Sequence, residues 1–229
     1  MTTQTLSSTT LRRIARRTRG HGAGSSVTRL MSPSGLGELL KPFVFLDIFS
    51  IGGDTLRRVM QEMPLHPHSG IATVTVFTEG RVRFDDPANG TGLIGYGGVE
   101  WMRAGSGVWH GKEMTPDDVP HMQGFQLWLA LPAELENGEP VSRYIEAKDV
   151  PQAGPAHVII GRHDGVQSPI PAPEGINYLL VTLRAGERWT YHPPRAISLD
   201  GWHWPRAHWC PMAVSMLARW WPSNRVRPL

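Results

Sequence analysis

The sequence predicts an all-β protein made of two modules in tandem. Glycine and proline are frequent, at 25 and 20 of 229 residues, and both favour turns over long helices. Apolar residues mostly alternate with polar ones instead of recurring at helical spacing. The strand-like runs form two groups on either side of a Glu-, Pro- and Gly-rich stretch. We therefore expect a first module over 25–132, a connector over 133–154 and a smaller, partial second module over 155–200.

Several runs in the first module are typical of strands. Residues 41–51 are dense in β-branched and aromatic residues behind a proline, and 70–86 form two strands of a meander joined near Glu79 and Gly80. The expected strands of this module cover 25–30, 41–51, 70–86, 97–110 and 124–132. The stretch between Gly53 and Pro64 is predicted to be an irregular connection. In the rest of the chain, strands are expected at 144–147, 157–161, 177–183 and 189–192.

The ends of the chain have a different composition. Residues 1–24 form a basic arm, and six arginines precede the first acidic residue, Glu38: Arg12, Arg13, Arg16, Arg17, Arg19 and Arg29. Such an arm suits a transit peptide, a nucleic-acid contact or a partly ordered, solvated terminus, and we expect the last of these. No apolar run reaches the roughly 18 residues that a membrane span needs. The single cysteine, Cys210, excludes an internal disulfide framework and fits a reducing compartment. We expect a cytoplasmic protein that contacts neither membrane nor nucleic acid directly.

The tail over 201–229 has no strand alternation and holds five of the nine tryptophans. One hypothesis is a reading-frame slip near residue 200, since tryptophan has the single codon TGG and the shifted frame around Trp202 and Trp220 reads as strand-like. The alternative is a genuine aromatic tail that contacts a partner or a membrane surface. A slip would leave the second module without its last strands.

His66 and His68 stand two residues apart before an alternating apolar run. On a continuous strand they would share a face with Ala72, Val74 and Val76, while Thr73, Thr75 and Glu79 would point to the other side. If the apolar set lines a barrel, the two imidazoles sit at its mouth and offer neutral nitrogens to a cation. The other interpretation is a pair of solvated strand-end histidines. Glycines before His110 permit bends that return this third histidine to the same mouth.

Four stretches together resemble the pirin family: P-F-V-F-L-D at 42–47, H-P-H-S-G at 66–70, E-W-M-R-A-G-S-G-V-W-H at 100–110 and Q-G-F-Q-L-W-L-A-L-P at 123–132. The resemblance covers roughly 40–195 and implies two tandem cupin β-barrels, a bicupin, of which the second is incomplete here. It also implies a metal in the first barrel, iron(II) or another divalent transition metal, held by His66, His68 and His110.

The family places a glutamate two residues after the last histidine, and that position is Lys112 here. Glu113 follows one residue later, so a bulge at Gly111 would be needed to turn it toward the metal. A lysine ammonium aimed at the ion would repel it by about 4 kcal/mol at 4 Å and an effective dielectric of 20. Either Lys112 turns away or the site is poor in metal. Glu113 is the expected fourth ligand, and His121 and Gln123 are reserve ligands that more often serve as surface groups.

The resemblance implies either a quercetin 2,3-dioxygenase-type enzyme or a redox-responsive regulator. The enzyme would act on a small planar aromatic enol, a flavonol for example, with Trp101, Trp109 and Trp128 available to line its pocket. The regulator would bind a protein partner without turnover. A third alternative is a metal-poor structural barrel. No nucleophile signature, phosphate loop or dinucleotide motif points to other chemistry.

Overall fold

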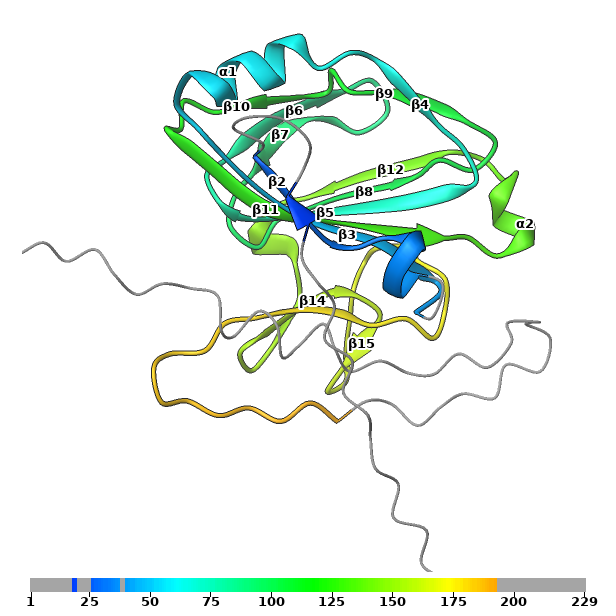
Figure 1. Cartoon of the computed structure of the whole chain (residues 1–229). Coiled ribbons are helices and arrows are strands. Elements are labelled where there is room, and N and C mark those ends of the chain that lie inside the picture. The colour runs from blue at the N-terminus through cyan, green and yellow to red at the C-terminus, as the bar shows by residue number, and fades with distance from the viewer. Residues whose placement is uncertain (1–17, 20–25, 38–39, 193–229) are drawn as a thin grey trace, which may run out of the picture.

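The computed structural model describes residues 18–19, 26–37 and 40–192. These residues fold almost entirely into antiparallel strands, in two groups one below the other in Figure 1. The predicted all-β class is confirmed. No helix in the described part of the chain is long and apolar enough to cross a membrane.

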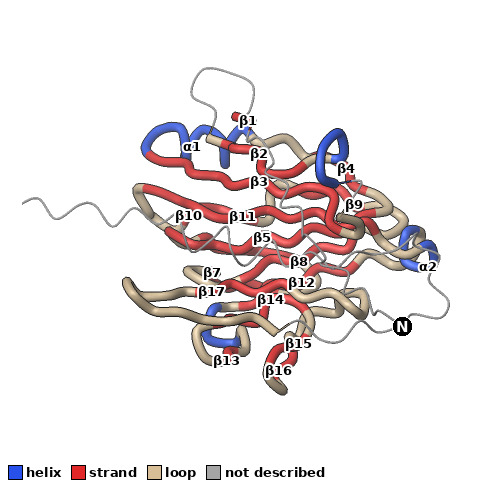
Figure 2. Tube along the Cα trace, turned by 60° about the horizontal axis from the view of Figure 1, so that its bottom comes forward, coloured by secondary structure: helices blue, strands red, loops and turns tan. Residues whose placement is uncertain are grey.

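The larger group has a seven-stranded sheet in the order β1-β2-β3-β11-β5-β8-β12. Its strands are β1 Thr18–Arg19, β2 Val27–Met31, β3 Phe43–Gly52, β11 His121–Ala130, β5 Ile71–Glu79, β8 Val99–Arg103 and β12 Val141–Ile145. Figure 2 shows the central strands β3, β11, β5 and β8 side by side. Strand β12 overlaps the short strand expected at 144–147 within the connector, and β1 comes from the segment expected as an arm.

Two small sheets cover one face of the large sheet (Figure 1). One contains β10 Met114–Pro116, β6 Val82–Asp86 and β7 Gly90–Ile94, and the other is a ribbon of β4 His66–His68 and β9 Val108–His110. The helix α1 Gly53–Glu62 lies beside them. The expectation of a loose stretch here was wrong. Leu56 and Val59, three residues apart, share a helix face that packs on the cluster around Phe77, so burial of that face stabilises the helix.

The smaller group follows the short elements α2 Ala133–Glu136 and η2 Ala147–Asp149. It consists of a sheet of β13 Gln152–Ala153, β14 Ala156–Ile160 and β17 Tyr178–Val181, and a hairpin of β15 Arg162–His163 and β16 Val166–Gln167. In the larger group, a single helical turn, η1 Pro33–Gly37, lies between β2 and β3. No strand forms over 189–192, where one was expected. The predicted tail lies outside the described residues.

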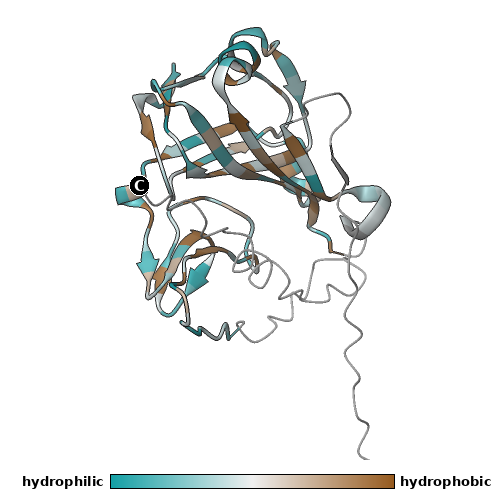
Figure 3. Ribbon diagram, turned by 60° about the vertical axis from the view of Figure 1, so that its left-hand side comes forward, coloured by the Kyte–Doolittle hydropathy of each residue, from teal (hydrophilic) through white to brown (hydrophobic). Residues whose placement is uncertain are grey.

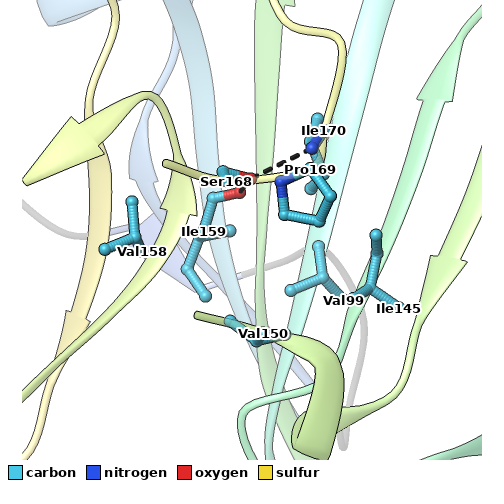
Figure 4. Close-up of a pocket in the computed structure, with 8 residues that line it drawn as sticks. All are labelled: Val99, Ile145, Val150, Val158, Ile159, Ser168, Pro169 and Ile170. Carbon is cyan, nitrogen blue, oxygen red and sulfur yellow. Dashed lines mark hydrogen bonds between the residues drawn. The ribbon is translucent and has the colours of Figure 1, made fainter. Parts of the chain in front are cut away.

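The two groups share one hydrophobic core. Val74, Trp101 and Leu129 of the large sheet pack with Ile160 and Tyr178 of the smaller group, and all five are buried. Figure 4 shows this junction, where Val99 and Ile145 face Ile159 and Ile170. Ser168 ties the smaller side together, because its hydroxyl donates to the Ile159 carbonyl and accepts from the Ile170 amide. The apolar segments accordingly gather in strands of both groups (Figure 3).

The apolar side chains of β5 point to the opposite face of the sheet from the one predicted. Ala72, Val74 and Val76 belong to the shared core and so face the smaller group, not the interior below the small sheets. Thr73 and Thr75 are only 3% and 5% exposed, so they do not face solvent either. Gly70, with φ of +67°, breaks the strand between His68 and Ile71, and the side-chain alternation therefore does not carry over from the histidines.

Candidate metal centre

Three imidazoles from the two strands of the β4–β9 ribbon converge on one point. His66 is the cross-strand partner of His110, and His68 lies two residues further along β4 on the same face. The ring centroids are 4.8 Å apart for His66 and His110, 4.9 Å for His66 and His68, and 5.5 Å for His68 and His110. One nitrogen from each ring lies within 4.8 Å of the others, which is close enough for all three to ligate one ion.

In two of the three rings, the Nδ1 atom has a partner within the protein. Nδ1 of His66 lies 2.9 Å from the Pro64 carbonyl oxygen, where it donates as the Nδ1–H tautomer. Nδ1 of His110 lies 3.4 Å from Oε2 of Glu113. Such outer partners fix a ligating histidine so that its Nε2 lone pair is free for a metal. Burial and the neighbouring imidazoles lower the pKa of His68, and burial lowers the pKa of His110 despite Glu113. Both rings are therefore neutral at neutral pH, as a metal requires.

Gly111 allows the chain to turn directly after His110. Its φ of +131° is strained for any residue with a side chain. A Cβ here would also come within 2.8 Å of the Pro64 carbonyl oxygen and 3.2 Å of His66 Nδ1. The turn brings the Glu113 carboxylate back onto the amides of Gly111 and Lys112, at 2.8 and 3.0 Å. Glu113 thus stands behind His110, and the three-histidine group forms without it.

Lys112 points away from the imidazoles. Its Nζ donates to the backbone carbonyl of Gln61 at 3.0 Å, in the last turn of α1. Carbonyl groups at a helix C-terminus lack intrahelical partners and carry partial negative charge, so a cation is favourable there. Of the two outcomes foreseen for this residue, the structure shows the one in which the ammonium is turned away.

A buried carboxyl that the sequence interpretation missed lies on the inner face of the large sheet. Four residues on adjacent strands form one cross-strand row of polar side chains: Asp47, Gln126, Thr75 and Glu100. Glu100 is 3% exposed, and burial, together with the smaller effect of the charge of Glu113, raises its pKa to about 7. Thr75 is its cross-strand neighbour, but the Thr75 hydroxyl has no partner with full hydrogen-bond geometry. Glu100 lies inside the E-W-M-R motif, but only the register between β5 and β8 shows that it shares a face with Thr75.

Only one of the three tryptophans proposed for a pocket lies at this centre. The Trp128 ring meets His68 edge to face with a centroid separation of 5.1 Å, and its Nε1 donates to Gln126 Oε1. Trp101 is fully buried in the shared core, and Trp109 is 68% exposed on the outer face of the ribbon. The reserve ligands are elsewhere too. His121 contacts Ser50 and Glu79, and Gln123 accepts from Thr78.

Comparison with known proteins gives a consistent result. Residues 24–129 match the family model described as Pirin. A pirin-like protein from Caulobacter vibrioides is 40% identical over 130 residues, which cover 57% of this chain and 46% of that protein. Among solved structures, GK1651 from Geobacillus kaustophilus matches with a TM-score of 0.54 and 28% identity, over 70% of this chain and 64% of its own.

A structure described as quercetin 2,3-dioxygenase from Acinetobacter baumannii matches with a TM-score of 0.55 and 27% identity, over 70% of this chain and 60% of its own. The chain spans about half the length of the curated relatives it matches, such as Pirin-1 from Arabidopsis thaliana, of which it covers 51%. The family-model match over 24–129 lies within the larger group of strands.

Proposed function

This chain belongs to the pirin family, and from that membership we propose that His66, His68 and His110 bind a divalent transition metal, iron(II) in the first instance, in an oxygenase of planar aromatic enols. The observation that carries the proposal is the convergence of three imidazoles, each with one ring nitrogen within 4.8 Å of the others. Three nitrogen donors with open positions suit iron, nickel or zinc, and iron is the choice for oxygen chemistry. When bound, such an ion supplies a Lewis acid and a redox centre beside the substrate.

Other residues of this chain orient the histidines and offer a surface to the substrate. Pro64 and Glu113 hold the rings of His66 and His110 in the ligating orientation. Glu113 as a fourth ligand stays a prediction, because its Oε2 is occupied by two backbone amides in this arrangement. Trp128, against His68, offers an apolar surface to an aromatic ring.

Glu100 is the interior group that we propose as proton acceptor for the substrate enol. Its pKa of about 7 lies near the working pH, where a general base is most effective. The charge of Glu113 contributes to the raised pKa of Glu100, so the two carboxyl groups lie within electrostatic range of each other. The name of the Acinetobacter protein supports a flavonol as the first substrate to test.

The test combines elemental analysis with oxygen uptake on quercetin. We expect wild-type protein to bind about one equivalent of iron and to consume oxygen with quercetin, and His68→Ala to lose both by more than tenfold. Trp109→Ser is the matched control, since this neighbouring ribbon residue points outward. Iron binding without turnover would reject the oxygenase and leave a metal-binding module. Metal below a tenth of an equivalent in wild type would reject the centre itself.

A second candidate function, protein binding, is favoured by the outer face of the same ribbon. Leu65 and Trp109 are 53% and 68% exposed, and Pro67, the cross-strand partner of Trp109, is exposed too. An apolar strip directly behind metal ligands would let a partner sense the state of the metal. A partner recovered by wild type and lost by Trp109→Ser, with iron content unchanged, would support this function.

A further inference from the structure

A second group of reactive side chains lies at the end of the large sheet, away from the three histidines. Ser50 is on β3, Glu79 on β5 and His121 on β11, the strand between the other two. Gln123 pairs with both Ser50 and Glu79, and His121 lies two residues before Gln123 on β11, diagonally across from each of them. Ser50 is an even number of residues from Leu46 on β3, and His121 is an even number from Leu127 on β11, so each pair shares a face of the sheet. The two leucines belong to the core shared with the smaller strand group, so this face is opposite the metal centre.

Each ring nitrogen of His121 faces one of the other two residues. Nε2 is 3.0 Å from the Ser50 hydroxyl oxygen, and Nδ1 is 3.1 Å from Oε1 of Glu79. A hydroxyl, an imidazole and a carboxylate in this order can activate the hydroxyl as a nucleophile: the ring accepts its proton while the carboxylate stabilises the imidazolium. The nucleophile, the base and the carboxylate thus come from adjacent strands of one rigid sheet.

The local backbone makes room for this arrangement. Gly52 is the cross-strand partner of His121, and a Cβ on Gly52 would come within 3.0 Å of His121 Cδ2. The absence of a side chain at Gly52 lets the ring lie against the neighbouring Ser50. Nδ1 is buried, and its contact with Glu79 lacks full hydrogen-bond alignment. The Glu79 side chain is 49% exposed, so it has room to rotate until its carboxylate is aligned with Nδ1. Catalytic hydrogen bonds often reach good alignment only when substrate is bound.

The geometry points to Ser50, His121 and Glu79 as a metal-independent site that hydrolyses small activated esters. Ser50 Oγ bonds to the ester carbonyl carbon as the bond to the leaving alcohol oxygen breaks, and His121 Nε2 passes the Ser50 proton to that oxygen. Water then attacks the acyl carbon, gives one proton to His121 and releases the acid, and the proton returns to Ser50. Aryl acetates fit best, because Ser50 is exposed on an open face and an aryl oxide leaves readily.

The experiment measures hydrolysis of p-nitrophenyl acetate by the full chain, with and without EDTA, and labelling by a fluorophosphonate followed by peptide mapping. We expect the label on Ser50, a rate that EDTA does not change, and a loss of about 100-fold for Ser50→Ala or His121→Gln, the size of a general-base contribution. Glu79→Gln should keep the label and lose about tenfold in rate. Ser106→Ala, also an exposed serine, is the matched control.

Thermal melts of each variant separate loss of chemistry from loss of folding. A purely structural role, in which His121 ties three strand ends together, predicts lower melting temperatures with an unchanged rate per folded molecule. That outcome, a label on another residue, or a Ser50→Ala variant as active as wild type would overturn the assignment. The metal centre plays no part in these readouts, so they stand whatever the outcome of the iron experiments.

Discussion

His66 lies directly opposite His110 across the β4–β9 ribbon, with ring centroids 4.8 Å apart. Because the two residues form one cross-strand pair, any change that shifts either strand changes the distance between two of the three imidazoles. The turn after His110 is the most sensitive point, since Gly111 packs against both Pro64 and His66. The first two predictions concern this turn.

Gly111→Ala should weaken iron binding by about 10- to 100-fold, the usual cost of disturbing a ligand's outer partners. The new methyl group would meet the Pro64 carbonyl and the His66 ring, and so displace the ligand. Titration with iron(II) under anaerobic conditions measures the change. Gly154→Ala is the control, because Gly154 also has a positive φ, of +56°, but open space around it. Equal effects of the two variants would contradict the local explanation.

Lys112→Met should leave iron affinity within about twofold of wild type. The ammonium is bound to the Gln61 carbonyl and does not face the imidazoles, so only a helix-end contact worth roughly 0.3–1 kcal/mol is lost. Iron titration and urea denaturation measure the two effects. A tenfold gain in iron affinity would instead show that the lysine repels the metal.

Glu100→Gln should remove a pH dependence of stability. Burial raises the pKa of Glu100 from 4.5 to about 7, so between these values the folded protein keeps a proton that the unfolded chain releases. The free energy of unfolding of wild type therefore falls as pH rises through this window, by up to about 3 kcal/mol. We expect the variant to resemble wild type at pH 4 and to be more stable at pH 8.

Urea denaturation at pH 4, 6 and 8 measures this difference. Glu136→Gln, on the exposed surface of α2, is the matched control and should follow wild type at every pH. A Glu100→Gln curve parallel to that of wild type would show that the carboxyl does not change its proton affinity on folding.

Ile160→Ala should destabilise the whole described fold by about 2–5 kcal/mol, because Ile160 is fully buried in the core shared by the two strand groups. We expect a single unfolding transition at lower urea concentration. Leu65→Ala, at an exposed position, should cost less than about 0.5 kcal/mol. Two separate transitions in wild type would contradict a shared core.

Local patterns in the sequence were sufficient for the strands and for the family. The alternating run after Gly70, the aromatic run after Pro42 and the strand ending in L-W-L-A-L-P all appear as strands within a few residues of the expected ends. The helix α1 was missed because its amphipathic face is short and its stability comes from packing on Phe77.

The sequence by itself determined the all-β class, the resemblance to pirins and the identity of the histidines, because strand alternation and motif order are properties of neighbouring residues. Only the tertiary structure decided which face of β5 is inside, where Lys112 and Glu113 point, and that Ser50, Glu79 and His121 meet. Those outcomes depend on what packs against each surface. The smaller strand group covers the apolar face of the large sheet, and Lys112 is bound by the C-terminal end of α1. Pairing between distant segments therefore decides which side chains meet.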